Sequence, residues 1–280
     1  MGIVTGVFLY AAFAAAFQFT SSVNVVEVYA TVTDARGEPV TGLRQEAFIV
    51  RENGEPQTIS TFTAGEFPLA VAVAIDRSFS MTGERLAVAK SAGRIFLSEL
   101  RPEDESMLLA IGSQVDVLAP LSSERGPQLA ALSRLDAFGT TGLYDAILRA
   151  IEAIQTARGR RALVLLSDGD DRYSTARATD ALERARRSDV LVYPVALGRQ
   201  RPPVFAELAS LTGGRSFHLR DTRTLPDTLR TIARELRHQY LIGYTPTKPI
   251  VPGSGEWRSI SVTVDRPEVR VRARDGYLVK

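Results

Sequence analysis

Three polar side chains follow the most apolar run of the chain, at a spacing that could present them to one point. Residues 69–75 read LAVAVAI, which is typical of a strand covered on both faces of a sheet. Asp76, Ser78 and Ser80 come directly after this run, each separated from the next by one residue. Spacing by two lets a single tight loop bring all three oxygen-bearing side chains together.

Two further oxygen-bearing side chains occupy comparable places elsewhere in the sequence. Asp168 follows a second apolar run, at residues 162–166, within Ser-Asp-Gly-Asp-Asp. Thr141 lies in Gly-Thr-Thr-Gly, immediately before an expected helix at 143–157. Because ligands of open α/β sheets bind beyond the carboxyl ends of the strands, we expect these side chains to converge at one end of the sheet.

The chemistry of such a cluster follows from its ligand types. Carboxylate and hydroxyl oxygens are hard ligands, which select Mg²⁺, or alternatively Mn²⁺ or Ca²⁺, and disfavour zinc and copper. The chain has no cysteine, which excludes thiolate sites and disulfides. Hydroxyl ligands add no formal charge, so a bound cation would stay electron-poor and could accept an acidic group. The predicted metal ligands are Asp76, Ser78, Ser80, Thr141 and Asp168.

The pattern between the apolar runs predicts the fold that must position these residues. Short apolar runs alternate with helical patterns, which indicates an α/β protein with a doubly wound, mostly parallel sheet. The expected strands are 69–75, 107–111, 162–166 and 190–196, with short ones at 115–118 and 215–218. The expected helices are 84–100, 143–157, 175–187, 205–211 and 225–237.

We divide the sequence into four regions. Residues 1–21 form a signal-like or anchor segment, and 67–238 form the α/β domain. Residues 22–66 and 239–280 are β-rich, and the simplest architecture pairs them into one small sheet domain. Within the first of them, Asn53-Gly54 predicts a hairpin, with residues 58–62 as the return strand.

The N-terminal segment bears on localisation. It is almost wholly apolar and uncharged from residue 2 to 17, which is short for a membrane span. It resembles the apolar part of a secretory signal, although no Lys or Arg precedes it. We expect an exported protein, periplasmic, cell-surface or secreted, that touches a membrane only through a possible anchor here. A buried core helix is the alternative.

Composition argues against a nucleic-acid partner. Lys and Arg number 34 against 32 Asp and Glu, for a formal net charge of +2. The densest arginine groups fit solvated helix ends better than a binding patch, because no reader motif or interleaved aromatics accompany them. These groups are Arg158, Arg160 and Arg161, and Arg184, Arg186 and Arg187.

The predicted ligands resemble the metal-ion-dependent adhesion site of von Willebrand factor type A and integrin inserted domains. That family has D-x-S-x-S, then a distant Thr, then a distant Asp. Asp76, Ser78 and Ser80 match the first motif, Thr141 matches the threonine that leads into a helix, and Asp168 matches the last position. The resemblance implies a cation that completes its coordination with a carboxylate of a partner.

This resemblance covers about residues 69–238 and departs from the family at one place. Phe79 occupies a position where the family often has Gly, which restricts the loop and places an apolar surface beside the site. The flanks resemble a narrower bacterial group of exported von Willebrand factor A-related proteins. The matching residues there are Val32, Thr33, Asp34, Gly37, Pro39, Val40, Gly42, Leu43, Phe48, Val50, Glu52, Gly54, Gln57, Gly243, Tyr244, Gly276 and Tyr277.

We therefore expect a protein-binding or adhesion module rather than an enzyme, whose partner is a protein or surface ligand presenting an acidic group. One alternative is a Mg²⁺-dependent phosphohydrolase with Asp76 as nucleophile. It lacks a second carboxylate two residues on, because Ser78 stands there, and Lys90 is the only lysine of the α/β region. The other alternative is a structural scaffold whose cation only orders loops.

Overall fold

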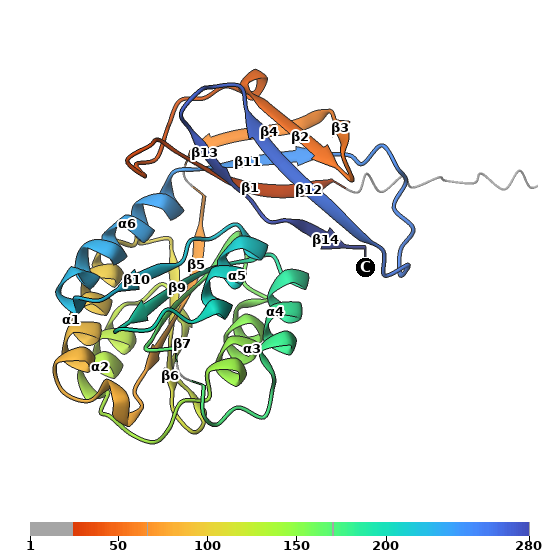
Figure 1. Cartoon of the computed structure of the whole chain (residues 1–280). Coiled ribbons are helices and arrows are strands. Elements are labelled where there is room, and N and C mark those ends of the chain that lie inside the picture. Colours follow the sequence, from red (N-terminus) through yellow and green to blue (C-terminus); the bar gives the residue numbers. More distant parts are fainter. Residues whose placement is uncertain (1–24, 66, 170, 280) are drawn as a thin grey trace, which may run out of the picture.

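The computed structural model describes residues 25–65, 67–169 and 171–279, and Figure 1 shows two packed parts. The larger part is a six-stranded sheet in the order β10-β9-β8-β5-β6-β7 with helices on both faces. Its strands are β5 (Leu69–Asp76), β6 (Glu105–Ile111), β7 (Val115–Ser122), β8 (Arg160–Ser167), β9 (Val190–Leu197) and β10 (Phe217–Leu219).

The sheet is mostly parallel, as the sequence predicted. β5 runs parallel to both β6 and β8, and β9 runs parallel to β8 and β10. Only β7 is antiparallel, at the edge, where it pairs with β6. The predicted doubly wound α/β fold is confirmed.

Six α-helices of the described chain cover this sheet. They are α1 (Glu84–Glu99), α2 (Gly126–Arg134), α3 (Leu143–Ile154), α4 (Ala178–Arg187), α5 (Pro203–Thr212) and α6 (Leu225–Arg237). The short 3-10 turns are η1 (Gln45–Ala47), η2 (Phe79–Met81) and η3 (Thr222–Thr224). The sequence did not predict α2.

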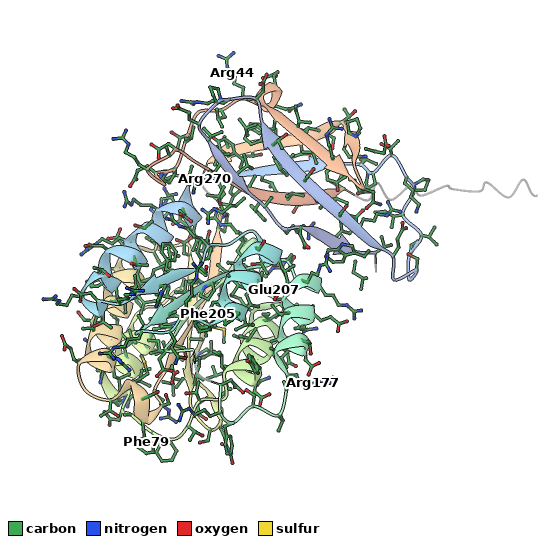
Figure 2. All side chains as sticks on the ribbon, viewed as in Figure 1. Arg44, Phe79, Arg177, Phe205, Glu207 and Arg270 are labelled. Atoms are coloured by element: carbon green, nitrogen blue, oxygen red, sulfur yellow. The ribbon has the colours of Figure 1, made fainter. Side chains whose placement is uncertain are left out.

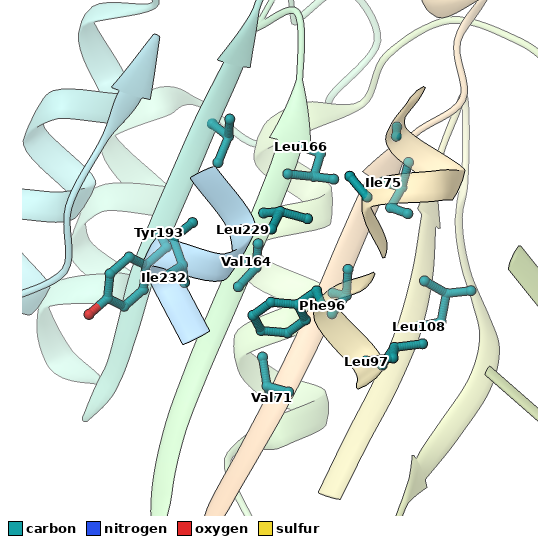
Figure 3. Close-up of a cluster of buried hydrophobic side chains, with 14 of the residues drawn as sticks. Val71, Ile75, Phe96, Leu97, Leu108, Val164, Leu166, Tyr193, Leu229 and Ile232 are labelled. Carbon is teal, nitrogen blue, oxygen red and sulfur yellow. The ribbon is translucent and has the colours of Figure 1, made fainter. Parts of the chain in front are cut away.

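Alternate residues of β5 feed two separate cores, which is why the whole strand is apolar. Val71, Val73 and Ile75 pack with side chains of α1, α2 and α6 (Figure 3). Ala72 and Ala74 face α3, α4 and α5 on the other side. Every residue of β5 is buried, so its end is a fixed platform for the loop that follows.

The smaller part is a β-sandwich made from both flanks of the sequence. One four-stranded sheet has the order β13-β1-β11-β4, and the other has the order β14-β12-β2-β3. The strands are β1 (Val26–Thr33), β2 (Phe48–Glu52), β3 (Glu55–Gln57), β4 (Ile59–Gly65), β11 (Gln239–Tyr244), β12 (Trp257–Val264), β13 (Arg270–Arg272) and β14 (Gly276–Leu278). Strands from both flanks lie side by side in each of these two sheets.

The hairpin after β2 differs from the sequence prediction in its return strand. Asn53 and Gly54 have φ of 50° and 87°, the left-handed backbone of a tight two-residue turn. The strand that returns on β2 is β3, with Glu52 opposite Glu55. The predicted return strand at 58–62 instead belongs to β4, which crosses to the other sheet and pairs with β11.

An ion pair with a buried carboxylate joins the two parts. Glu235 of α6 is fully buried and accepts hydrogen bonds at 2.7 Å from both Arg215 and Arg272. Arg272 lies on β13, so the carboxylate links the α/β part to the sandwich. In Figure 2, the label of Arg44 marks the sandwich, and Phe79 lies at the opposite end of the α/β part, farthest from the sandwich. The sandwich therefore leaves the end of the sheet near Phe79 uncovered.

The predicted signal or anchor at 1–21 lies outside the described residues. Within residues 25–279, apart from 66 and 170, the helices are too short or too polar to cross a bilayer.

Candidate functional site

The loop after β5 folds around the carboxylate of Asp76. Asp76 is fully buried, and its Oδ1 accepts a hydrogen bond of 2.8 Å from the backbone N–H of Ser78. This bond turns the chain so that the hydroxyl oxygens of Ser78 and Ser80 lie 3.0 Å apart. Ser78 is buried, whereas Ser80 is exposed and marks the solvent side of the cluster.

Residues from two other loops reach the second oxygen of Asp76. The Thr141 hydroxyl lies 3.4 Å from Asp76 Oδ2, and the Ser167 hydroxyl donates to the same oxygen at 2.6 Å. Thr140, the neighbouring threonine, instead lies 3.2 Å from the hydroxyl of Ser113. Only one member of the threonine pair therefore faces the cluster.

Ser167 is a contact that sequence reasoning missed. It is the last residue of β8, it is fully buried, and its hydroxyl also accepts a hydrogen bond of 3.0 Å from the N–H of Gly169. The signal was available, because a polar residue closing an apolar strand beside a candidate site is unusual. Ser167 holds the Asp168 loop against Asp76.

Asp168 lies half-buried next to Asp76, and one of its two carboxylate oxygens has no hydrogen-bond partner among the described residues. This oxygen is Oδ1, which is buried. The loop geometry depends on Gly169, which has φ of 86°, and a Cβ there would lie 1.8 Å from Cγ of Pro202. No other residue type fits without moving the loop.

The electrostatics of this cluster favour a positive charge. Burial raises the pKa of Asp76, and the nearby negative charge of Asp168 raises it further. Hydrogen bonds from Ser167 and Ser78 oppose this effect on the pKa of Asp76 but do not overcome it. A buried carboxylate beside a second, half-buried one is a place where a positive charge would lower the electrostatic free energy.

The oxygen spacing also fits a cation. Adjacent ligands of an octahedral ion with bonds of about 2.1 Å lie about 3 Å apart. The measured separations are 3.0 Å between the hydroxyls of Ser78 and Ser80, and 3.4 Å between Thr141 and Asp76. No group of three or more acidic, histidine or cysteine side chains gathers in the described part of the chain. A cation here would therefore depend on hydroxyl oxygens.

Asp171 ties the loops together and does not join the cluster. Its Oδ1 accepts hydrogen bonds from the N–H of Leu143 at 2.7 Å and from the hydroxyl of Ser174 at 2.6 Å. The Ser174 hydroxyl in turn accepts from the N–H of Tyr144 at 2.9 Å. These contacts satisfy free N–H groups at the start of α3 and fix the loop that carries Thr141.

Comparisons with known proteins agree with this fold. A family profile described as von Willebrand factor type A domain matches residues 71–170. This segment runs from β5 through the loop after β8. Over these 100 of the 280 residues, the sequence is therefore similar to a von Willebrand factor type A domain.

Solved structures show the same fold at low sequence identity. A von Willebrand factor type A protein from Catenulispora acidiphila is 16% identical with a TM-score of 0.56, over 94% of this chain and 65% of that one. The conserved hypothetical protein BatB from Bacteroides thetaiotaomicron is 17% identical with a TM-score of 0.50, over 60% of this chain and 98% of that one. The domain of the type V pili tip protein Mfa5 from Porphyromonas gingivalis is 11% identical with a TM-score of 0.51, over 62% of this chain and 97% of that one. The comparison with curated proteins gave no match.

Proposed function

We propose that this domain binds a protein or surface ligand that presents an acidic group, through a divalent cation. The observation that carries the proposal is the pairing of the buried carboxylate of Asp76 with the half-buried Asp168. The Oδ1 of Asp168 has no hydrogen-bond partner among the described residues. The cation is Mg²⁺, with Mn²⁺ or Ca²⁺ as alternatives, because all the available ligands are oxygens.

Each residue has a separate part in this proposal. The hydroxyls of Ser78, Ser80 and Thr141 bind the cation directly, and Asp76 and Asp168 supply the negative charge, directly or through water. When bound, the cation offers an electron-poor position that a partner carboxylate can fill. Ser80 is the exposed member of the set, so that position faces solvent.

The surroundings of Asp76 favour binding over phosphoryl transfer. Lys90, the lysine of α1, donates to the carbonyls of Ser133 and Leu135 at 2.9 and 2.7 Å. Arg77 is held by Asp116 at 2.7 Å. Lys90 and Arg77 are thus both engaged by other groups, and Asp76 is itself fully buried.

Relatives with this fold support a partner-binding role and an exported location. One similar structure is described as a type V pili tip protein and another as an aerotolerance-related membrane protein. The apolar N-terminal segment is consistent with export. We propose a periplasmic, cell-surface or secreted location for this chain as well.

Calorimetric titration of Mg²⁺ and Mn²⁺ tests the metal site. Wild type should bind one cation, and Asp76→Ala should not. The matched control is Asp136→Ala, which removes an exposed carboxylate from the loop after α2 and should bind as wild type does. Equal binding by the wild type and Asp76→Ala would refute the site. A phosphatase assay with Mg²⁺ is the second arm, and turnover that depends on Asp76 would refute the binding function.

A further inference from the structure

We propose that an aromatic rim around this site selects partners whose acidic residue is flanked by apolar side chains. The aromatic rim consists of Phe79, Phe138 and Tyr173, and Arg85 stands beside it. The inference rests on the proposed function and specifies the partner's chemistry. It names an acidic protein segment with apolar neighbours as the occupant.

The rim gathers the exposed aromatic surface of the described chain in one place. Phe79, Phe138 and Tyr173 are 65%, 61% and 60% exposed. Other large hydrophobic residues with comparable exposure in the described chain are aliphatic, and several of them are scattered over the sandwich and its loops. Single exposed hydrophobic residues need no explanation, but aromatic rings gathered around a candidate site mark an interaction surface.

The backbone fixes each ring next to a candidate metal ligand. Phe79 stands between Ser78 and Ser80, and its N–H donates to the carbonyl of Gly139 at 3.1 Å. Phe138 directly precedes Gly139, and its N–H donates to the carbonyl of Arg77 at 2.7 Å. Two main-chain hydrogen bonds thus join the loop after β5 to the loop before α3, and the rings of Phe79 and Phe138 remain exposed to solvent.

A main-chain hydrogen bond also joins Tyr173 to the predicted ligand Thr141. Its N–H donates to the carbonyl of Thr141 at 3.1 Å. The rim therefore borders the cluster from the loops that carry Asp76, Thr141 and Asp168. Because main-chain hydrogen bonds hold the backbone of these loops, binding costs little ordering of the loops.

The charge beside the rim fits an anionic partner. Arg85 is half-buried, and its Nη1 donates to the carbonyl of Ser80 at 3.0 Å. Arg85 forms no ion pair within 4.0 Å with another described residue, and its guanidinium lies next to the exposed ligand Ser80. Arg77 differs, because Asp116 neutralises it at 2.7 Å and its guanidinium lies 5.4 Å from the ring centre of Phe138.

These features together define the partner's surface. A carboxylate approaching Ser80 meets the cation site and Arg85, while the residues on either side of it meet Phe79, Phe138 and Tyr173. If the partner residues beside the carboxylate were polar, they would stay hydrated against the rings, and their contact would add no binding free energy. A nucleic acid fits less well, because a chain with a net charge of +2 and no basic motif offers no stripe for a phosphate backbone.

The test uses three blocked peptides fixed to a biosensor surface: Gly-Leu-Glu-Leu-Gly, Gly-Ser-Glu-Ser-Gly and Gly-Leu-Gln-Leu-Gly. With Mg²⁺ present, we expect the wild-type chain to bind the Leu-Glu-Leu peptide about tenfold more tightly than either other peptide. The triple variant Phe79→Ser, Phe138→Ser, Tyr173→Ser should lose the preference for leucine over serine. Val251→Ser and Ile49→Ser, exposed aliphatic residues of the sandwich, are the matched controls and should keep it.

The outcomes separate the rim from the metal site. The role of the aromatic rim is refuted if wild type binds the Leu-Glu-Leu and Ser-Glu-Ser peptides equally, or if the triple variant keeps the preference for leucine. Mg²⁺ calorimetry tests the metal site independently of either result. Binding of the Leu-Glu-Leu peptide that is unchanged by EDTA refutes the proposed function itself. No binding of that peptide up to about 1 mM overturns the inference. A stronger response to a single-stranded DNA probe than to any peptide overturns the choice of a protein partner.

Discussion

Replacing Asp76 by Asn should stabilise the cation-free protein at neutral pH and abolish its stabilisation by Mg²⁺. Burial raises the folded-state pKa of Asp76, so the ionised carboxylate lowers the stability of the metal-free fold. Asn has the same shape and no charge, and its carbonyl oxygen can still accept the N–H of Ser78. The same substitution removes a ligand, so the cation loses its affinity.

The magnitude of the Mg²⁺ effect follows from mass action. A cation at about 100 times its dissociation constant stabilises the folded state by about 2.7 kcal/mol. With a dissociation constant of about 10⁻⁴ M, as in weak oxygen-ligand sites, about 10 mM MgCl₂ reaches that ratio. A domain of this size gains about 2–4 °C in melting temperature per kcal/mol, so the wild type should gain about 5–11 °C.

The assay is a thermal melt in EDTA and in MgCl₂, for wild type, Asp76→Asn and the surface control Asp136→Asn. We expect the control to behave as wild type does. Asp76→Asn should melt higher than wild type in EDTA and should not respond to MgCl₂. A Mg²⁺ shift of equal size in wild type and Asp76→Asn, or a lower melting temperature of Asp76→Asn in EDTA, would refute the reasoning.

Three further expectations follow from the structure. The gain in melting temperature from Mg²⁺ should shrink as pH falls, and the decline should begin above the pH at which an ordinary aspartate titrates. The raised pKa of Asp76 means that protons compete with Mg²⁺ for its carboxylate, and the same protonation stabilises the metal-free fold. A gain that stays constant down to pH 4 would contradict this expectation. Gly169→Ala should weaken Mg²⁺ binding in calorimetry, since φ is 86° and the new Cβ would meet a proline side chain at 1.8 Å, whereas Gly126→Ala has open space and should not. Glu52→Ala should cost about 3–5 kcal/mol in urea unfolding, because it removes one of the two carboxylates paired with the buried Arg258 and the acceptor of two tyrosine hydroxyls. The exposed control Glu55→Ala should cost under about 0.5 kcal/mol.

The sheet could be predicted from the sequence because both of its faces are covered. A strand buried on each side must be apolar throughout, so residues 69–75 and 162–166 stood out without any periodicity. The helix α2 was missed for the opposite reason. It has nine residues, and its buried set contains only Gln128, Ala131 and Leu132, which is too short a pattern to distinguish from a loop.

The side chains of the candidate site could be selected from the sequence, but most of the contacts that hold them in place could not. Asp76 and Thr141 follow strands or precede helices at places that the parallel sheet dictates, so their approach followed from topology. The roles of Ser167 and Asp171 depend on hydrogen bonds between loops, which sequence spacing does not encode. Phe138 could not be placed beside Phe79 from sequence, because main-chain bonds between separate loops bring them together.

The most direct measurement of the central claim is a crystal structure of the chain grown with MnCl₂ and recorded at a wavelength where manganese scatters anomalously. The account predicts one anomalous peak about 2.2 Å from the hydroxyl oxygens of Ser78, Ser80 and Thr141, with Asp76 and Asp168 bound directly or through water and one position open to solvent. An anomalous map without a peak between these side chains, while their oxygens keep the hydrogen bonds described above, would contradict it.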